Sequence, residues 1–510
     1  MTVPPFSRAV AVLTVGGAAA GLTAGGAPTP PVRPPARPPA IAPANAPANV
    51  TQTAPGSRQA DSVPVPTLPV DRFVLPNGLT VLVSRDTAAP IVSVTVWYHV
   101  GSKNELPGRT GFAHLFEHLM FQGSAHAAKG VHIRTIEDAG GTMNGTTQND
   151  RTNYFETVPV NYLETVLWLE SDRMGYLLPA LTQGTLDNQR DVVKNERRYR
   201  VDNQPFGRAG EVVDAALYPA TNPYSWPVIG SMADLSAASL EDVRQFFRRY
   251  YAPDNAVLAI SGDVDPRRTR ELVEHYFGPI PRGPAVDRPT VAPVRLVAEK
   301  RLVLEDPKAT VPRLAIVWPA VGVHSPDMAP LDALADILSQ DRTSRLTKLL
   351  VYDRQVATTV SATNVSHEDA GSFSITVSPR PGVPLTTIEQ LVDSVVGGLG
   401  AMPPRPQEVD RTKAYRLVGT ITDLEPTQSR AETLAEGETY FQDPLHYRTE
   451  LRAAQAVTAA DVERVAREYL TAGRVVLSMV PSGKLDLVSK PGESYTNVTQ
   501  GPAAAGGAGQ

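Results

Sequence analysis

A weak internal repeat constrains this chain more than any other feature of its sequence. A helix-like stretch at 240–250 precedes an apolar stretch at 256–258, and the same order returns at 460–469 and 475–477. Matching residues stand 219 positions apart in three pairs: Asp242 and Asp461, Tyr250 and Tyr469, Val257 and Val476. Near the start of each copy, Trp97 and Trp318 are 221 positions apart. Such spacing over a unit of about 220 residues indicates two copies of one domain.

The elements expected in each copy indicate an α+β fold. Two apolar runs around a Pro-Asn-Gly turn at 72–83 predict a β-hairpin. The strand expected at 91–100 alternates between Val92, Val94, Val96 and Tyr98 on one face and more polar residues on the other, which predicts a half-buried sheet. Helical patterns follow at 110–122, 158–178 and 182–200. We therefore expect two homologous domains, each a mostly antiparallel sheet packed with helices.

Composition shifts predict the boundaries of these domains. One positive charge ahead of a small, apolar run is typical of a secretory signal peptide, although a disordered Ala-rich tail has a similar composition. Pro and Ala then dominate a stretch that cannot bury a core. The expected parts are a signal peptide at 1–27, a Pro/Ala-rich linker at 28–69, an N-terminal domain at 70–282, a homologous C-terminal domain at 283–486 and a disordered tail at 487–510.

Charge and residue usage exclude several classes of function. The net charge of −5 gives no basic footprint for nucleic acid, so we expect no polynucleotide partner. No later stretch reaches the roughly 18 apolar residues that a membrane span needs, so no stable span is expected in the mature chain. The chain has no Cys, which excludes disulfides and thiol redox chemistry. The predicted location is outside the cytoplasm, either periplasmic or secreted.

The segment 110–121 carries the residues with the clearest chemistry. His114 and His118 are one helical turn apart, and Glu117 stands between them in the sequence. At 100° per residue the two histidines lie about 40° apart on a helix, with Glu117 about 60° to the other side of His114. Two such imidazoles can bind one tetrahedral zinc ion, which leaves the carboxylate to act as a general base. The alternative is a histidine pair with a structural role.

A catalytic zinc also needs a third protein ligand. Glu196 is a candidate, since it stands on an expected helix whose Val192 and Val193 point to a core. A lone glutamate in a charged helix is more often a solvated residue.

The chain resembles the pitrilysin/insulinase family of zinc peptidases and its mitochondrial-processing-peptidase relatives. His-Leu-Phe-Glu-His is the inverted zinc motif of this group. The resemblance continues through 140–155, 169–174 and 192–196. The family's third ligand is a glutamate 75 to 80 residues beyond the second histidine, and Glu196 follows His118 by 78 residues. The resemblance thus implies one zinc per chain on His114, His118 and Glu196, with Glu117 as the base of a metalloendopeptidase.

The resemblance also implies how a peptide substrate binds. The 140–154 segment is similar to the family's edge strand, where an extended peptide is added to the sheet, so Asn144, Gly145 and Thr146 are expected to bind substrate. Without the zinc motif, this segment would be interpreted as a turn before a strand. Family members often carry a second glutamate seven residues before the third ligand. Here that position is Gln189, which is expected to orient a ligand from the second coordination shell.

One departure from the family pattern implies a partner. In the family, a C-terminal-type domain supplies an Arg and a Tyr seven residues apart, which hold the substrate backbone and stabilise the oxyanion. The matching positions are Val351 and Thr358, while Tyr352 and Arg354 have the wrong order and spacing. Neither Val351 nor Thr358 can replace an Arg fork or a phenol. The expected partner is a homologous subunit that carries the Arg/Tyr pair, with this chain as the zinc-bearing half of a heterodimer.

Two other functions remain open at this point. The chain could be a non-catalytic scaffold or core subunit of the same fold, or an exported metallohydrolase that arrived at the motif independently. The intact zinc residues disfavour the scaffold, and the internal repeat disfavours the convergent enzyme. His126, His132 and the loop 367–369 lack ligand spacing and are assigned structural or solvated roles.

Overall fold

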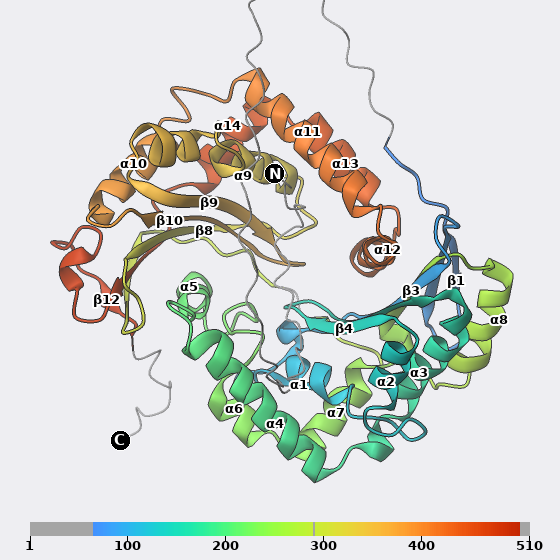
Figure 1. The fold of residues 1–510 in the computed structure, drawn as a ribbon. Helices are drawn as coiled ribbons and strands as arrows, with labels where there is room; N and C mark the ends of the chain where they lie inside the picture. The colour runs from blue at the N-terminus through green and yellow to red at the C-terminus, as the bar shows by residue number, and fades with distance from the viewer. Residues whose placement is uncertain (1–64, 289–290, 500–510) are drawn as a thin grey trace, which may run out of the picture. The chain divides into compact units, whose positions relative to one another are not determined.

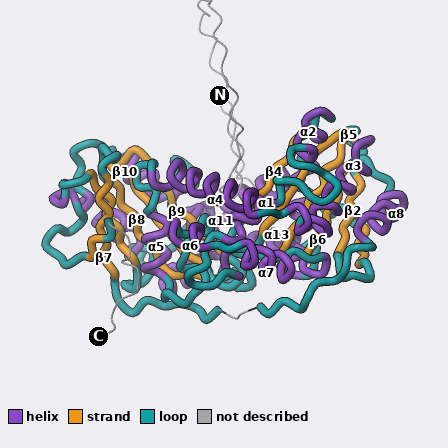
Figure 2. Tube along the Cα trace, turned by 90° about the horizontal axis from the view of Figure 1, so that it is seen from below, coloured by secondary structure: helices purple, strands orange, loops and turns teal. Residues whose placement is uncertain are grey.

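The structure is a computed structural model that describes residues 65–288 and 291–499. The predicted signal peptide and nearly all of the Pro/Ala-rich linker lie outside the described residues. The strands gather in two separate groups (Figure 2), which are two six-stranded sheets. Among the described residues, no helix combines the length and the apolar character needed to cross a membrane.

The first sheet has the strand order β1-β2-β6-β3-β5-β4. Its strands are β1 (Asp71–Val74), β2 (Thr80–Arg85), β3 (Ile91–Tyr98), β4 (Thr142–Thr147), β5 (Thr152–Pro159) and β6 (Ala256–Gly262). Neighbours are antiparallel except for the parallel pair β2 and β6. The predicted hairpin is present as β1 and β2, and Gly78 has the positive φ of 94° that its tight turn requires.

The second sheet has the order β12-β7-β11-β8-β10-β9. Its strands are β7 (Lys300–Asp306), β8 (Arg313–Ala320), β9 (Ala357–Ser366), β10 (Gly371–Pro379), β11 (Val475–Pro481) and β12 (Thr496–Asn497). The run β7-β11-β8-β10-β9 repeats β2-β6-β3-β5-β4 in both order and strand direction. The predicted pair of homologous α+β domains is therefore confirmed, and the sheets differ only in the outermost strand, β1 or β12.

Helices cover each sheet (Figure 1). The first half of the molecule, as we name β1 to β6 with their helices, contains α1 (Phe112–Leu119), α2 (Val131–Asp138), α3 (Leu163–Tyr176), α4 (Gln183–Arg197), α5 (Ala209–Leu217), α6 (Met232–Ala237), α7 (Leu240–Tyr250) and α8 (Pro266–Phe277). The second half contains α9 (Met328–Ser339), α10 (Leu385–Gly397), α11 (Pro406–Asp423), α12 (Thr427–Phe441), α13 (Tyr447–Ala456) and α14 (Ala459–Tyr469). The predicted boundary near 282 lies between α8 and β7.

The repeat is real, but two of its sequence matches are wrong. Helices α7 and α14 keep the spacing of 219 at both ends. Trp97 lies in a cluster with Leu82 on the face of the first sheet that α12 covers, whereas Trp318 lies in the helix-packed core of the second half. Val257 and Val476 differ in the same way. Because successive strand residues point to opposite faces, these matches do not pair equivalent positions.

Helix α12 of the second half lies on the first sheet. Its Ala431, Leu434 and Ala435 form a buried cluster with Trp97, Val257 and neighbouring strand residues. Val92, Val94, Val96 and Tyr98 face the first core as predicted. The opposite face of β3 is buried too, so the expected half-buried sheet is covered on both sides.

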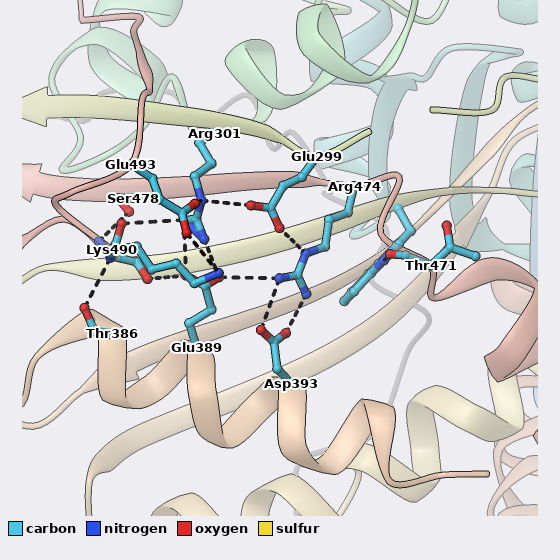
Figure 3. A network of polar contacts seen from close by, with 12 residues as sticks. Glu299, Arg301, Thr386, Glu389, Asp393, Thr471, Arg474, Ser478, Lys490 and Glu493 are labelled. Atoms are coloured by element: carbon cyan, nitrogen blue, oxygen red, sulfur yellow. Dashed lines mark hydrogen bonds and ion pairs between the residues drawn. The ribbon is translucent and has the colours of Figure 1, made fainter. Parts of the chain in front are cut away.

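The ordered chain extends beyond the predicted start of a disordered tail at 487. Buried Glu389 on α10 accepts a hydrogen bond from Arg301 (3.2 Å) and pairs with Lys490 (3.1 Å), as Figure 3 shows. Glu493 pairs with Arg301 at 2.8 Å in the same network. Farther on, β12 pairs with β7. Buried charges are stable only when they are paired, so this network fixes the segment in place.

Candidate metal centre

Helix α1 presents the histidine pair from a buried position. The helix begins after Gly111, whose φ is 88°, and a side chain there would collide with Gly230. The carboxylate of Glu105 accepts hydrogen bonds from the backbone N–H groups of Gly111 (2.9 Å) and Ala113 (2.8 Å). Glu105 thus satisfies donors that the first turn leaves free, which fixes the direction of the helix.

The structure brings the three predicted ligands together. Nε2 of His118 lies 3.1 Å from Oε2 of Glu196, and Nε2 of His114 lies 3.8 Å from the same oxygen. One ligand atom from each residue falls within 4.8 Å of the others. Glu196 stands near the C-terminal end of α4, where Val193 is buried in the core. Val192 is 39% exposed, so the expectation that both valines face the core is wrong for this one.

The protonation states of these residues suit a divalent metal. Burial, with the neighbouring His118, lowers the pKa of His114 to about 3, so its ring is neutral and can donate a lone pair. Both ring nitrogens of His114 are buried and make no hydrogen bond with other described residues. Burial alone would raise the pKa of Glu196, but the neighbouring His118, His114 and Arg200 together outweigh this and lower the pKa. Two imidazoles and one carboxylate form a donor set that fits zinc.

Glu117 lies beside the cluster with a carboxylate ready to accept a proton. Burial raises its pKa to about 6, and a hydrogen bond from the hydroxyl of Thr147 opposes that rise. The Oγ1–Oε2 distance of this bond is 2.7 Å. A pKa close to neutrality suits a general base at physiological pH.

The predicted substrate strand is β4, at the edge of the first sheet. Asn144, Gly145 and Thr146 all lie on it, and of the described strands only β5 pairs with it. A Cβ atom on Gly145 would stand 3.2 Å from Cγ of Glu117, so the strand passes close to the candidate base. The hydroxyl of Thr146 bonds to Asn153 (2.5 Å), so this side chain is already engaged within the protein. Substrate binding by these residues stays a prediction.

Gln189 is buried on α4. Its side-chain amide donates to Asn188 Oδ1 at 2.8 Å rather than to a zinc ligand. Its role in orienting a ligand therefore remains a prediction.

The two positions matched to the family's Arg/Tyr pair lie in the second half. Val351 belongs to the π-helical segment Thr347–Asp353 and packs against the second core. Thr358 lies on β9, and its hydroxyl donates to the backbone oxygen of Ser378 at 3.0 Å. Tyr352, next to Val351, is 55% exposed. Val351 offers no side-chain donor, and the hydroxyl of Thr358 is already engaged.

A second group of potential ligands lies behind β5. Burial lowers the pKa of His132 to about 3, and its Nε2 stands 3.2 Å from Glu156. Glu170 completes the group. Arg173 already supplies a positive charge there, with Nη2 at 3.2 Å from Glu156 and its guanidinium over the Tyr154 ring. Because this cation offsets the carboxylates, the contacts agree with the structural role assigned to His132 from the sequence, which stays a prediction.

The loop 367–369 is half-buried rather than fully solvated as the sequence led us to expect. Glu368 accepts a hydrogen bond from buried Lys103 at 2.5 Å and bonds to His99 at 2.6 Å. The ring of His367 stacks on Tyr224 at 5.0 Å. The loop is half-buried because residues distant in sequence pair with it and cover part of it. His126 bonds to Asp172 at 2.5 Å and keeps its structural assignment.

Sequence reasoning missed three residues around the centre. Thr147 bonds to the candidate base Glu117, and Glu105 bonds to the first turn of α1. Arg200 pairs with Oε1 of Glu196 at 3.2 Å. Its spacing of four residues from Glu196 was a usable signal, because such pairs meet on one helix face. No local signal indicates Glu105.

Comparisons with known proteins agree with this geometry. The model of the insulinase family (peptidase family M16) matches residues 80–223, and that of the peptidase M16 inactive domain matches 237–415. The zinc protease PqqE of Helicobacter pylori is 28% identical over 414 residues, which cover 78% of this chain and 90% of the relative. The mitochondrial-processing peptidase subunit beta of Blastocladiella emersonii is 26% identical over 412 residues, which cover 78% of this chain and 85% of the relative.

Solved structures extend the likeness to the whole fold. The crystal structure of a protease from Helicobacter pylori has a TM-score of 0.76 and 25% identity, and the match covers 81% of this chain and all of that one. The periplasmic protease PqqL from Escherichia coli has a TM-score of 0.67 and 19% identity, with 82% of this chain matching 48% of that chain. The two family models, the duplicated fold and the relatives together show that this chain belongs to the insulinase family of peptidases, M16.

Proposed function

We propose that this chain is a zinc-dependent endopeptidase that hydrolyses extended peptides. The observation that carries the proposal is the cluster of buried His114 and His118 with half-buried Glu196, with Glu117 beside it and an edge strand passing close to the base. Relatives named as zinc proteases support the same chemistry.

The residues divide the reaction between them. His114, His118 and Glu196 would hold one zinc ion, which supplies Lewis acidity that polarises a peptide carbonyl and makes water acidic enough to attack near neutral pH. Glu117 takes the proton from the attacking water and returns it to the leaving amine. No covalent bond to the protein is needed.

The edge strand accounts for a preference for extended peptides. Strand β4 leaves one side of its backbone unpaired by the described strands, and an incoming peptide can add there as a further strand. Gly145 brings this backbone close to Glu117. Asn144, Gly145 and Thr146 would then bind the substrate through main-chain groups, which places the scissile bond near the base.

We further propose a homologous subunit as the partner. Val351 and Thr358 supply neither the fork of an Arg nor a phenol, so stabilisation of the oxyanion has to come from another chain. One relative is named as a subunit, and this chain matches about half the length of PqqL. Both features fit a molecule that acts as one half of a larger enzyme.

A non-catalytic scaffold is the second candidate, because Val351 and Thr358 depart from the family pattern and one matching model is described as an inactive domain. The complete ligand set and the buried Glu117 disfavour a scaffold.

For the location of the protein, we propose export to the periplasm or the exterior. The N-terminal sequence supports this location, and so does the likeness in fold to PqqL, a periplasmic protease.

Hydrolysis of a quenched peptide library tests this function. The mature chain is assayed with and without a co-expressed relative that carries the Arg/Tyr pair, and its zinc content is measured. We expect about one zinc per chain and hydrolysis only with the partner, abolished by Glu117→Gln. Full activity of the chain alone would refute the heterodimer. Bound zinc with no hydrolysis in any combination would favour the scaffold.

A further inference from the structure

Thr147 is the last residue of β4 and is buried beside the candidate base. Its hydroxyl donates a hydrogen bond to Oε2 of Glu117 at 2.7 Å. Hydrogen bonds to carboxylates are stronger and more directional than bonds between neutral groups, so this contact orients the carboxyl group.

The two oxygens of Glu117 have different surroundings. Oε2 is held by Thr147, whereas Oε1 is buried and makes no hydrogen bond with any described residue. A buried polar atom without a partner costs free energy, and such atoms are rare in folded proteins. The arrangement therefore keeps one oxygen fixed and leaves the other open to an atom that arrives with the reactants.

The Thr147 hydroxyl is itself fixed by the backbone. Thr147 pairs with Thr152 of β5, and the next residue closes the hairpin through a bond from Gln148 N to Arg151 O at 2.9 Å. Arg151 also donates to the backbone oxygen of Thr146 at 2.9 Å. Strand alternation places Thr147 on the same face as Gly145, which lies against Cγ of Glu117.

We propose that Thr147 is a positioning residue for the general base. It holds Oε2 so that Oε1 faces the attacking water, whose proton moves to Oε1 while its oxygen bonds to the scissile carbon. When the C–N bond breaks, Oε1 returns that proton to the leaving nitrogen. Because β4 carries both Thr147 and the edge to which the substrate adds, this strand sets the position of the substrate and the orientation of the base. This inference rests on the proposed peptidase function.

The test compares Thr147→Val, Thr147→Ser and a matched control, Thr157→Val, which removes a hydroxyl bonded to Ser93 on the same sheet. Each variant is assayed for peptide hydrolysis together with the homologous partner subunit, and its zinc content and thermal unfolding are measured as well. For Thr147→Val we expect kcat to fall about 10- to 100-fold with KM changed less than about twofold, since a misplaced group costs rate more than binding. Thr147→Ser should restore most of kcat. The kcat of Thr157→Val should equal that of the wild type. The zinc content of all three variants should also be unchanged.

Several results would overturn the role of Thr147. An unchanged kcat in Thr147→Val, or an equal loss in Thr157→Val, would do so. A raised KM with normal kcat would assign Thr147 to substrate binding instead. If Thr147→Val does not fold, the kcat values of Thr147→Ala and Thr147→Ser are compared instead, because Ala and Ser differ only in the hydroxyl group. Equal kcat values in these two variants would overturn the proposal. Activity that survives Glu117→Gln would refute the peptidase mechanism itself, whereas a dead Glu117→Gln beside a fully active Thr147→Val refutes this inference alone.

Discussion

The two halves of the molecule repeat one pair of helices and use it in opposite ways. Helix α9 follows β8 as α1 follows β3, and α11 holds the place that α4 holds in the first half. In both halves the first helix carries two polar side chains four residues apart, which face one side chain from the second helix. The sets are His114, His118 and Glu196 in the first half, and Asp332, Asp336 and Arg416 in the second.

The charges explain why the two sites differ. Arg416 lies against both carboxylates, with Nε at 3.0 Å from Asp336 and Nη1 at 3.4 Å from Asp332. The second half thus contains its own cation, fixed by the fork geometry of the guanidinium. The first half instead joins two imidazoles to one carboxylate and leaves the ring nitrogens of His114 without hydrogen bonds among the described residues. The same backbone arrangement can hold a metal or a salt bridge, and side-chain identity decides which.

The largest expected effect tests whether only the first site binds zinc. His118→Ala should remove zinc and lower kcat/KM by at least about 1000-fold, since the loss of one ligand disables the whole site. Asp336→Ala, at the matching position of the second half, should keep zinc and activity. Metal analysis and peptide hydrolysis measure both. A fall in zinc content for Asp336→Ala would break the comparison.

A smaller effect is expected when the internal cation is removed. Arg416→Ala leaves Asp332 and Asp336 close together without their partner, so we expect a loss of about 2 to 3 kcal/mol in the free energy of unfolding. Zinc content should not change. Urea unfolding measures the loss, and Arg416→Lys is the control that keeps the charge without the fork. If Arg416→Ala is as stable as the wild type, the guanidinium makes no net contribution to the free energy of unfolding.

The contact between the halves can be weakened at one residue. Glu432 on α12 accepts hydrogen bonds from Thr95 (2.6 Å), Trp97 (2.7 Å) and Asn153 (2.6 Å) of the first sheet. Glu432→Gln puts an NH2 group against donors, so we expect about 1 to 2 kcal/mol of destabilisation. Thermal unfolding measures it, with the surface change Glu463→Gln on α14 as the control. Equal stability of the two variants would contradict the assigned role.

The smallest expected effect is a dependence of stability on pH. Burial raises the pKa of Asp336 to about 6, although Arg416 opposes this. A raised folded-state pKa means that the folded protein keeps a proton which the unfolded chain loses, so this stabilisation is present below about pH 4 and is lost as pH rises through 6. In Asp336→Asn, the free energy of unfolding should change less between pH 4 and 7 than in the wild type, by on the order of 1 kcal/mol. Unfolding free energies of both proteins across this range give the answer, and parallel curves would exclude the effect.

Local pattern was enough to predict the core of the candidate site. The spacing of His114, Glu117 and His118 indicated one helix face, and α1 presents all three from buried positions. The resemblance to the family, rather than local pattern, indicated Glu196 from its distance in sequence to His118, and Glu196 lies 3.1 Å from that residue. The repeat predicted two domains of one fold, and the two strand orders confirm it. Periodicity carries this information because helix and strand faces depend only on near neighbours.

Contacts between distant residues were decided by the tertiary structure alone. The pattern of the loop around Glu368 predicts a solvated loop, yet it is half-buried because Lys103 and His99 bond to it from 265 and 269 residues away. The two tryptophans match in the sequence but lie on opposite sheet faces, because strand register is set by pairing. Thr147 reaches Glu117 only when β4 packs against α1. The sequence by itself therefore determined the duplicated fold and the types of the candidate ligands, while packing decided which groups hold the candidate base and which polar loop is covered.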